Sequence, residues 1–561
     1  MSHSVSPLRM RRVLCLVLAW ASGAAARRAG AAYKSSAAPP AAQPATHPLT
    51  VHVEYQQLDA GVDGVELIWC VKTALAMLAS AVHLPGAAAQ PLLLPRPCAV
   101  ERTWPSGKVE CVQEAQAGMC LQAQHNASLF HRPPEVVADA VLYVTATAAS
   151  DGGLVGCGRP GSAAATTTGV PPGTLAAAGG ACLVDGNTGR PVAGAVNVCP
   201  DRLLAVRGAS AFSRDALVLD VVHELLHVLA FSEGLYTSFK HAVTRAGGRA
   251  LVTSPAVLAV ARQHFNCPAL SGVPLEDNGG EGTANTHWEM RALNGELMVG
   301  TVVAGQRPAL SNFTLALLED SGWYAPQYSA ATPLTWGAAA GCDFAEAALA
   351  RKPCPEAPPS RFLCEPAAGE TATCTHDSLA VGTCARLPLT SIDEQCFAVL
   401  PYSNWVCRDS TLADDDNDRS QWGYAFGPGA RCVAGGRQPW SRRVGSLVYT
   451  MSEPSAGCFR LDCPAGAHQP SVSVAGAQLS CPADSTVNLD RALRGWTGQL
   501  GPCPAANLCT SLACPGDCSG SGECVGGGRC LCWPGWQGTN CSDCAAVTGQ
   551  APSAPCLSAA P

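Results

Sequence analysis

The sequence predicts an α+β fold, in which a mixed sheet and one buried helix precede a disulfide-rich C-terminal region and a small cysteine-stapled module. Apolar, β-branched runs at 51–53, 140–147 and 193–199 are typical of strands of one sheet. Residues 214–231 are apolar almost all round at helical spacing, which is typical of a buried helix. Beyond residue 337, cysteines recur at short intervals with few periodic segments, which indicates a disulfide-held region.

Two further helices and one loop are expected from the pattern of apolar residues. Residues 73–84 repeat apolar side chains at helical spacing and stop before Pro85. A shorter repeat at 312–320 stops at Gly322. The Gly- and Ala-rich segment between the second and third strands is expected to be a loop.

The chain of 561 residues is weakly charged, with 14% charged residues and a formal net charge of -7. No segment of the mature chain is dense in Lys and Arg, so nucleic acid is not expected as a partner. A chain of this length is too long for a single domain with one hydrophobic core, and it indicates about three or four folded units.

The first 26 residues are typical of a secretory signal peptide, because three arginines precede a short apolar stretch at 13–21. Export agrees with the 30 cysteines, which persist as disulfides in an oxidising compartment. Without Cys15 in the signal, 30 − 1 = 29 cysteines remain, and this odd number predicts a thiol that is free or paired with another chain. No later apolar stretch is long enough for a transmembrane span, so we expect a secreted, extracellular protein.

The buried helix carries the motif His223-Glu224-Leu225-Leu226-His227. Residues four apart share a helix face, so both imidazoles can bind one ion while Glu224 addresses water on that ion. The motif also occurs by chance on solvated helices. On a buried helix, however, three unpartnered ionisable groups would cost about a few kcal/mol each, which favours a metal ion. A zinc ion with three protein ligands keeps one position for water and lowers that water's pKa toward about 7, as hydrolysis requires.

The spacing leaves the third ligand open. No acidic residue lies between Glu233 and Glu276, so a glutamate from a directly following helix is excluded. Ala230 and Glu233 occupy the places of Gly and His in the short HExxHxxGxxH pattern, which excludes that pattern too. The remaining downstream candidates are His241, His264 and His287.

Four segments downstream of the motif bear on the choice of the third ligand. They are His287-Trp288-Glu289-Met290-Arg291, Glu296-Leu297-Met298, Leu318-Glu319-Asp320-Ser321-Gly322-Trp323-Tyr324, and Gly341-Cys342-Asp343-Phe344. They resemble the third-ligand segment, the Met-turn and later segments of the leishmanolysin family, which are metzincin proteases with a long insertion between the second and third His. The resemblance covers roughly residues 50–510 and favours His287 as the third ligand.

The resemblance implies a zinc endopeptidase with a metzincin-type catalytic core. In such a protein, His223, His227 and His287 bind one catalytic Zn²⁺. Glu224 is the general base, and Met298 forms the hydrophobic floor of the Met-turn.

Other residues near the motif carry weaker expectations. The strand at 193–199 resembles the strand that pairs with extended substrate in metzincins. Ala230 replaces the family's Gly, and it would cost about 1 kcal/mol or more if the turn there needs a positive φ. Asp220 is interpreted as a residue of the helix surface rather than one that orients a ligand. His241 and His264 are interpreted as surface residues.

Six cysteines near the C-terminus resemble an EGF-like module. The family's pairing implies the disulfides Cys514–Cys524, Cys518–Cys530 and Cys532–Cys541. Because so small a unit cannot bury a sufficient core, its bridges must stabilise it.

These patterns divide the chain into seven predicted segments. They are a signal peptide (1–26), a disordered or removable leader (27–48), an N-terminal catalytic subdomain with the HExxH helix (49–232), a central subdomain with the third ligand and Met-turn (233–330), a disulfide-rich C-terminal domain (331–510), an EGF-like module (511–545) and a tail (546–561).

The predicted function is a secreted zinc-dependent metalloendopeptidase that hydrolyses peptide bonds of extracellular or cell-surface proteins through zinc-activated water. Its expected partners are protein or peptide substrates, and the EGF-like module offers a means of association with the cell surface or matrix. One alternative is an adhesion or matrix-binding protein on a catalytically weak or inactive scaffold. A third hypothesis is an amidase or another zinc hydrolase of small molecules, which would need a closed pocket.

Overall fold

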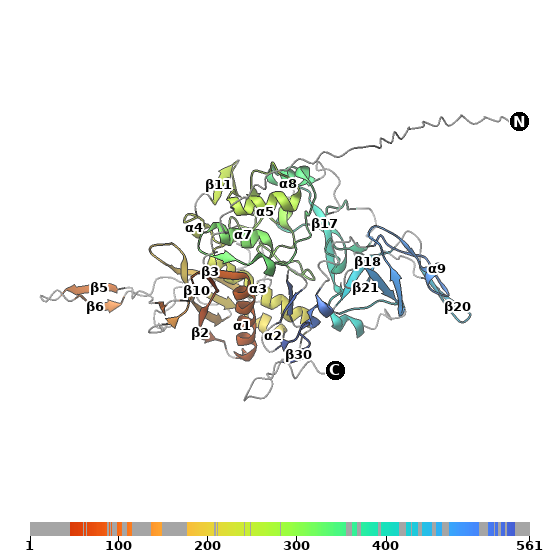
Figure 1. The fold of residues 1–561 in the computed structure, drawn as a ribbon, viewed down its shortest axis with the longest axis horizontal. Helices are drawn as coiled ribbons and strands as arrows, with labels where there is room; N and C mark the ends of the chain where they lie inside the picture. The colour runs from red at the N-terminus through yellow and green to blue at the C-terminus, as the bar shows by residue number, and fades with distance from the viewer. Residues whose placement is uncertain are drawn as a thin grey trace, which may run out of the picture. The chain divides into compact units, whose positions relative to one another are not determined.

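A four-stranded mixed sheet supports the helix that carries the HExxH motif (Figure 1). In the computed structural model, the strand order is β2-β8-β10-β9, with β8 parallel to both its neighbours and β9 antiparallel to β10. The strands are β2 (Val51–Leu58), β8 (Ala140–Ala146), β10 (Pro191–Val198) and β9 (Ala177–Val184). The three strands expected from their apolar runs are confirmed and share this sheet.

The structure describes residues 45–544, apart from residues 60, 63, 87–88, 90, 93–97, 104–108, 115–135, 148–156, 158–176, 207–208, 210, 240–241, 247, 281, 355–361, 367–371, 391–393, 415–421, 428, 436–439, 451–455, 463–469, 504–513, 521, 526–528 and 533–535. The predicted signal peptide, most of the predicted leader and the predicted tail lie outside the described residues.

Strand β9 overturns the expectation of a loop between β8 and β10. Ala and Gly have low strand propensity, so the local sequence gave no signal of a strand. Strand β9 forms because it pairs with β10 and packs against α3. A Cβ added to Gly179 would lie 2.7 Å from the carbonyl oxygen of Glu224, so this strand packs on the helix only because its residues are small.

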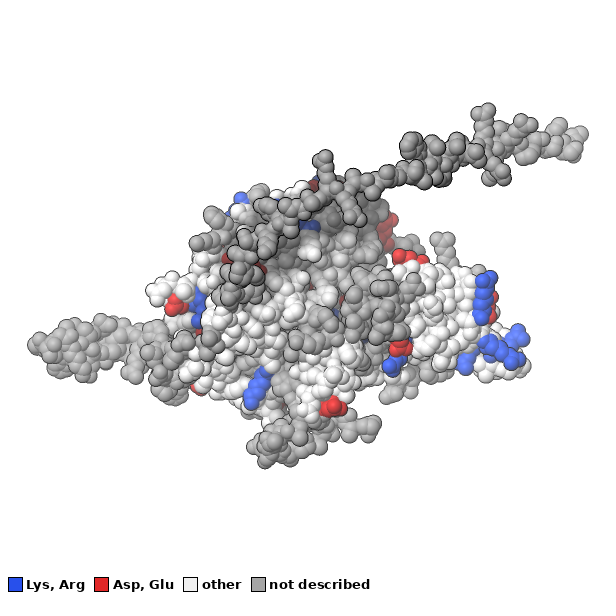
Figure 2. Space-filling view, in the orientation of Figure 1, with Lys and Arg blue, Asp and Glu red and all other residues white. Residues whose placement is uncertain are grey.

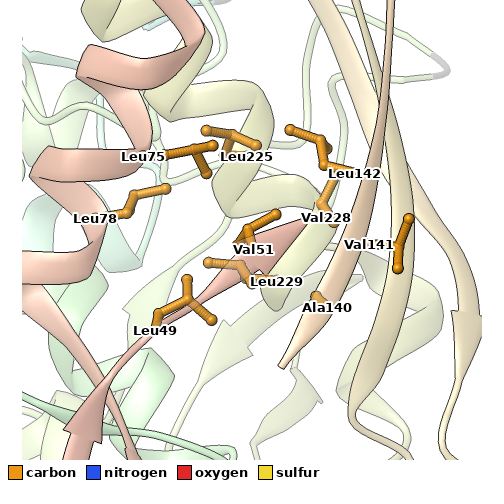
Figure 3. Close-up of a pocket in the computed structure, with 10 residues that line it drawn as sticks. All are labelled: Leu49, Val51, Leu75, Leu78, Ala140, Val141, Leu142, Leu225, Val228 and Leu229. Carbon is orange, nitrogen blue, oxygen red and sulfur yellow. The ribbon is translucent and has the colours of Figure 1, made fainter. Parts of the chain in front are cut away.

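Two apolar helices, α1 (Gly64–Ala81) and α3 (Ala211–Leu229), pack against each other, and α3 packs against β9 and β10. Figure 3 shows side chains of both helices and of the sheet converging on one small space. Its lining is entirely apolar and includes Leu78, Leu142 and Leu225. The cavity volume of about 10 Å³ leaves room for no more than about one water molecule. The helix with the HExxH motif therefore rests on a closely packed core.

Helix α1 begins earlier and ends earlier than the helix expected at 73–84. Its last predicted turn is instead strand β3 (Val82–Pro85), which pairs with β1 (Thr46–Pro48) and β14 (Ala325–Pro326). By length and composition, α1 is also the one candidate membrane span among the described helices, contrary to the expectation of none. Fully buried α1 side chains such as Leu67 and Leu78 belong to the hydrophobic core.

Helix α7 (Asn312–Asp320) has the bounds that the sequence predicts. Its N-cap Ser311 accepts a hydrogen bond from the backbone N–H of Phe313. The Asp320 carboxylate accepts from the backbone N–H groups of Ala256 and Val257 at the start of α5 (Pro255–Phe265). The other elements of this region are α2 (Pro200–Ala205), α4 (Glu233–Tyr236), β11 (Val243–Ala246), β12 (Arg249–Val252), α5 (Pro255–Phe265), β13 (Val273–Pro274), α6 (Met290–Leu293), η3 (Tyr328–Ala330) and α8 (Cys342–Leu349).

The C-terminal region is built of small antiparallel sheets. Its elements are β15 (Thr373–Cys374), β16 (Ala380–Arg386), β17 (Phe397–Val406), η5 (Ser410–Asp414), β18 (Ala430–Ala434), β19 (Ser441–Val444), β20 (Leu447–Thr450), β21 (Ala456–Asp462), β22 (Ser471–Val474), β23 (Ala477–Ser480), β24 (Val487–Asn488), α9 (Leu489–Ala492), β25 (Trp496–Thr497) and β26 (Gln499–Leu500). The largest hydrophobic cluster extends to Ala398, and a separate cluster around Trp440 and Phe459 begins after it. The subdomain boundary expected near residue 330 stays a prediction.

Disulfides cross-link the chain, and most of the described bridges lie in the C-terminal part, as the cysteine spacing predicts. The described bridges are Cys157–Cys199, Cys267–Cys342, Cys354–Cys396, Cys364–Cys384, Cys374–Cys432, Cys407–Cys458, Cys481–Cys503, Cys518–Cys530 and Cys532–Cys541. Among the described residues, Cys70 on α1 is a free, buried cysteine, as the odd count allowed. So many bridges support an extracellular or secreted location.

The last described segment contains short elements joined by disulfides. They are η7 (Pro515–Gly520), β27 (Gly522–Val525), β28 (Arg529–Cys532), β29 (Trp536–Gln537) and β30 (Asp543–Cys544). Two of the three expected bridges are present here, and Cys514 is disulfide-bonded. The side chain of Cys524 lies outside the described residues, and the EGF-like assignment stays a prediction.

Two small strand pairs complete the N-terminal part: β4 (Pro91–Leu92) with β7 (Val136–Val137), and β5 (Cys98–Thr103) with β6 (Val109–Glu114).

Candidate metal centre

Three imidazole rings from two distant parts of the chain meet at one point. His223 and His227 lie one turn apart on α3, and His287 comes from the segment between β13 and α6. The Nε2 atoms of His223 and His227 are 3.0 Å apart, and each lies 3.1 Å from the Nε2 atom of His287. The structure therefore brings the three sequence-predicted ligands together.

The opposite nitrogen of each ring contacts a backbone carbonyl oxygen. The Nδ1 atoms of His223, His227 and His287 lie 2.7 Å, 2.6 Å and 2.9 Å from the carbonyl oxygens of Leu297, Phe231 and Thr283. A carbonyl oxygen only accepts, so each Nδ1 carries the proton and each Nε2 presents a lone pair. Three lone pairs that face one another repel unless a cation lies between them. The donor set therefore fits a metal ion that takes imidazole nitrogen ligands.

Burial keeps these rings neutral. It lowers the pKa of His223 to about 4 and that of His287 to about 3, and the neighbouring His223 adds to the effect on His287. Burial and the other two rings hold the pKa of His227 well below its ordinary value. Because only a neutral imidazole can bind a metal through its lone pair, all three are competent ligands at neutral pH.

The segment that carries His287 is fixed by its neighbours in the sequence. Trp288 is fully buried, its backbone N–H donates to the Met298 carbonyl oxygen, and its indole N–H donates to Thr314 of α7. Met298 is itself fully buried in the same hydrophobic cluster. The third imidazole is thus held by a tryptophan anchored both to the predicted Met-turn and to a helix.

Glu296 stabilises the predicted Met-turn, a role that its place in the sequence does not predict. Its carboxylate is fully buried and accepts hydrogen bonds from the Met298 backbone N–H and from the hydroxyl groups of Ser311 and Thr314. Burial raises the pKa of Glu296 to about 7, against the effect of these donors. The carboxylate fixes the turn whose next carbonyl, that of Leu297, orients His223. Two of its donors come from the N-cap and the first turn of α7, so no local pattern could have revealed this role.

An ionic cluster lies near His287, whose carbonyl oxygen accepts a hydrogen bond from the backbone N–H of Glu276. Arg249 pairs with Asp277 at 2.7 Å and with Glu289, and Arg351 pairs with Asp277 as well. Glu276, Asp277 and Glu289 are close enough to suggest a second cation site. The guanidinium of Arg249 already supplies positive charge there, so we interpret the cluster as a structural ion-pair network.

Glu224, the predicted base, follows His223 on α3 and reaches toward strand β9. Burial raises the pKa of its carboxyl group well above the ordinary value, and the charge of Asp220 one turn earlier adds to the effect. The backbone N–H of Gly179 on β9 donates to this carboxyl group and opposes the rise. A proton acceptor with elevated affinity is the kind of group that general acid–base catalysis uses near neutral pH.

The strand that was expected to pair with substrate has no free edge. The strand predicted at 193–199 is β10, but both its edges are occupied, by β8 and by β9. Among the described strands, β9 pairs only with β10, so β9 presents a free edge beside Glu224. The prediction for 193–199 is therefore wrong, because a strand at Ala177–Val184 that has no local strand signal occupies that edge.

Three further expectations can be compared with the structure. Ala230 is not among the described non-glycine residues with a positive φ, so this Ala imposes no left-handed strain. Asp220 is not a surface residue: its side chain is 14% exposed, and burial raises its pKa to about 7. His264 was expected on the surface, but it is largely buried, and its Nε2 atom lies 2.7 Å from the Trp336 carbonyl oxygen. His241 lies outside the described residues.

Comparison with known proteins agrees with this geometry. Residues 165–513 match the leishmanolysin family of peptidases (Peptidase_M8, leishmanolysin). A leishmanolysin-like peptidase of Drosophila melanogaster is 38% identical over 207 residues, covering 29% of each chain. The ciliated left-right organizer metallopeptidases of Homo sapiens and Danio rerio are 32% identical over 274 residues and 28% identical over 347 residues. These matches cover 45% and 58% of this chain and 32% and 50% of those proteins.

The chain thus spans between 29% and 50% of the length of these three relatives. The family match covers more than half of the chain and includes all three imidazoles of the cluster. The chain belongs to the leishmanolysin family of metallopeptidases.

Proposed function

We propose that this chain is a secreted, zinc-dependent metalloendopeptidase that hydrolyses peptide bonds of extracellular or cell-surface proteins. The observation that carries the proposal is the set of three Nε2 atoms that lie within 3.1 Å of one another, with Glu224 next to His223 on the same helix. His223, His227 and His287 would hold the ion. When bound, Zn²⁺ would supply a Lewis acid for the scissile carbonyl and activation of water.

Glu224 is assigned the proton transfers. Its raised proton affinity suits it to accept a proton from the attacking water and to return it to the departing amine. The backbone N–H of Gly179 would keep the carboxylate directed at the edge of β9 rather than into solvent.

Strand β9 is assigned the grip on the peptide. A free strand edge offers alternating N–H and C=O groups, so an extended substrate can add to the sheet as a further strand. The small residues of β9 leave the substrate main chain close to Glu224, since Gly179 already approaches that residue without a side chain. Such a grip favours extended peptides over small amides, which would need a closed pocket.

The experiment is cleavage of a denatured protein by the purified chain, with and without a zinc chelator, alongside the variant Glu224→Gln. We expect cleavage that the chelator abolishes and that zinc restores, and at least about a hundredfold loss in Glu224→Gln, since general acid–base catalysis contributes about 10²–10⁴-fold. Absence of cleavage would support the alternative of an adhesion protein on an inactive scaffold. Chelator-insensitive cleavage, or unchanged activity in Glu224→Gln, would contradict the assignment of hydrolysis to this metal centre and this base.

A further inference from the structure

The β19–β20 hairpin in the C-terminal region is exposed on both of its faces. Its last two pairs before the turn are Val444 with Leu447 and Arg443 with Val448, and the next pair is Arg442 with Tyr449. Successive pairs in a ribbon point to opposite faces, so a buried face would show as alternating burial. Instead, every residue of β20 is exposed.

The exposed side chains of this hairpin are unusually apolar. Val444, Leu447, Val448 and Tyr449 are 48%, 60%, 55% and 43% exposed. They are four of the twelve large hydrophobic side chains that are exposed among the described residues, and they lie within six positions of one another. A two-stranded ribbon of this kind gains nothing from leaving such side chains in water, so a contiguous apolar tip indicates a binding surface.

Arginine side chains surround the base of the hairpin. Residues 441–450 and 489–497 hold four Arg and one Asp, which gives 4 − 1 = +3 against the chain's formal -7. Arg443, Arg491 and Arg494 are exposed, and Arg442 lies over the ring of Trp496. Figure 2 shows basic side chains gathered over the region where Figure 1 labels β20 and α9. The surface therefore complements a negatively charged partner.

The order of side chains along the hairpin identifies the partner's chemistry. Aliphatic residues flank the turn, an arginine and a valine follow, and an arginine and a tyrosine come next. Aliphatic side chains are favoured in the acyl region of a bilayer, whereas Tyr and Arg are favoured at the level of the headgroups. Two residue pairs span roughly 7 Å, which matches the roughly 5–10 Å that interfacial segments penetrate.

We propose that the tip of the β19–β20 hairpin inserts into the interface of a membrane that carries anionic lipids, with the surrounding arginines on the headgroups. A flat protein surface would cover only one face of the ribbon, whereas a fluid interface can surround both. Membrane binding at this site is independent of the metal centre and of the predicted EGF-like module. It would place the peptidase against a lipid surface as a peripheral protein.

The test is co-sedimentation of the purified full chain with phosphatidylcholine vesicles, prepared with and without phosphatidylserine, at low and high salt. We expect binding to the anionic vesicles that high salt weakens, because the arginine contribution is screened. We expect Val444→Ser/Leu447→Ser to weaken binding at least about tenfold, since two buried aliphatic side chains are lost. Arg443→Gln/Arg494→Gln should weaken it by a similar factor on anionic vesicles alone.

Leu204→Ser is the matched control, because Leu204 on α2 is a comparably exposed aliphatic side chain, at 48%. It should bind like the parent protein. Circular dichroism melts should be unchanged for all variants, which separates loss of binding from loss of folding. Absence of binding to anionic vesicles, or equal binding by Val444→Ser/Leu447→Ser, would overturn the proposal and leave the hairpin for a protein partner.

Discussion

Each imidazole of the candidate metal centre is oriented by a backbone carbonyl oxygen. The carbonyls of Leu297, Phe231 and Thr283 belong to three different loops, so the orientation of the rings depends on the exact course of the backbone around them. Groups that orient metal ligands in this way typically change metal affinity by about 10–100-fold when they are disturbed. Residues that fix these loops should therefore affect the metal without touching it.

Glu296 is the clearest such residue. In Glu296→Ala, the hydroxyl groups of Ser311 and Thr314 and the Met298 backbone N–H lose a buried acceptor, at a cost of about 1–3 kcal/mol. The turn should loosen, and zinc affinity should fall about 10–100-fold. Glu296→Gln, which keeps an acceptor oxygen, should lose less. Competition with a calibrated chelator measures both, with the exposed Glu365→Ala as control. Unchanged affinity in Glu296→Ala would show that the turn does not orient His223.

Asp220 gives a prediction about pH. Burial raises its pKa from the ordinary 3.8 to about 7, so between these values the folded chain keeps a proton that the unfolded chain has lost. This contribution to stability is complete below about pH 4 and is lost as pH rises to about 7. Asn cannot ionise, so Asp220→Asn avoids the loss of stability that the parent protein undergoes when this buried carboxyl group ionises. The variant should be more stable than the parent by on the order of 2–4 kcal/mol at pH 7.5, and by much less at pH 4.5.

Denaturant unfolding of the two proteins at both pH values measures this difference. A stability difference that is the same at pH 4.5 and pH 7.5 would show that Asp220 is ionised in the folded state, in which case Arg202, 4.0 Å away, would be its effective partner.

Some residues of the candidate site could be predicted from the sequence and others could not. His223 and His227 could be paired because one helix period separates them, a relation that needs no tertiary information. His287 lies 60 residues beyond His227, and only a family resemblance separated it from His264. Asp220 and Glu296 were misjudged or overlooked because their burial is produced by elements distant in sequence.

At the scale of elements, the close contact between the sheet and α3 depends on glycine residues, which have no side chain. A Cβ added to Gly194 of β10 would lie 2.2 Å from a Val228 methyl carbon on α3. Gly194→Ala should therefore push the helix from the sheet and destabilise the fold by about 1–3 kcal/mol. Val228→Ala alone should destabilise it by leaving a cavity.

The double variant supplies the control for this contact. Because Ala at 228 makes room for the new methyl group, the two losses should be less than additive by on the order of 1 kcal/mol. Thermal unfolding of the four proteins measures the coupling. Strictly additive losses would mean that the strand and the helix do not meet closely at these two residues.

Element prediction succeeded where apolar periodicity was strong and failed where it was not. Helices α3 and α7 follow from their patterns, and α7 has the predicted bounds. Strand β9 was missed because Ala and Gly carry no strand signal, so the strand edge that we propose for substrate pairing lies on β9 and not on the predicted β10. The end of α1 was misplaced because pairing of Val82–Pro85 with two other strands overrides helical periodicity.

Across the whole molecule, disulfides join segments that are distant in sequence. Cys267–Cys342 closes a separation of 75 residues and links the end of α5 to the start of α8. Replacing both cysteines with Ala should lower the free energy of unfolding by about 4 kcal/mol, because the bridge no longer restricts the conformations of the unfolded chain. Denaturant unfolding checks this value. Cys364→Ala/Cys384→Ala, with a separation of 20, should cost less, and the reverse order would contradict the loop-length argument.

The α+β class and the disulfide-rich C-terminal region were both predictable from composition and spacing. Which cysteines pair was not, since pairing depends on the tertiary fold. The exposed hairpin tip at 444–449 was equally hidden, because a short run of apolar residues beside two arginines does not tell whether other elements cover it.

The central claim is that His223, His227 and His287 together hold one zinc ion. The most direct measurement is the zinc content of the purified parent protein and of His287→Ala after dialysis against a weak chelator. The account predicts one zinc per chain in the parent protein and near-complete loss in the variant, with an unchanged circular dichroism spectrum. Equimolar zinc retained by His287→Ala, or none in the parent protein, would contradict it.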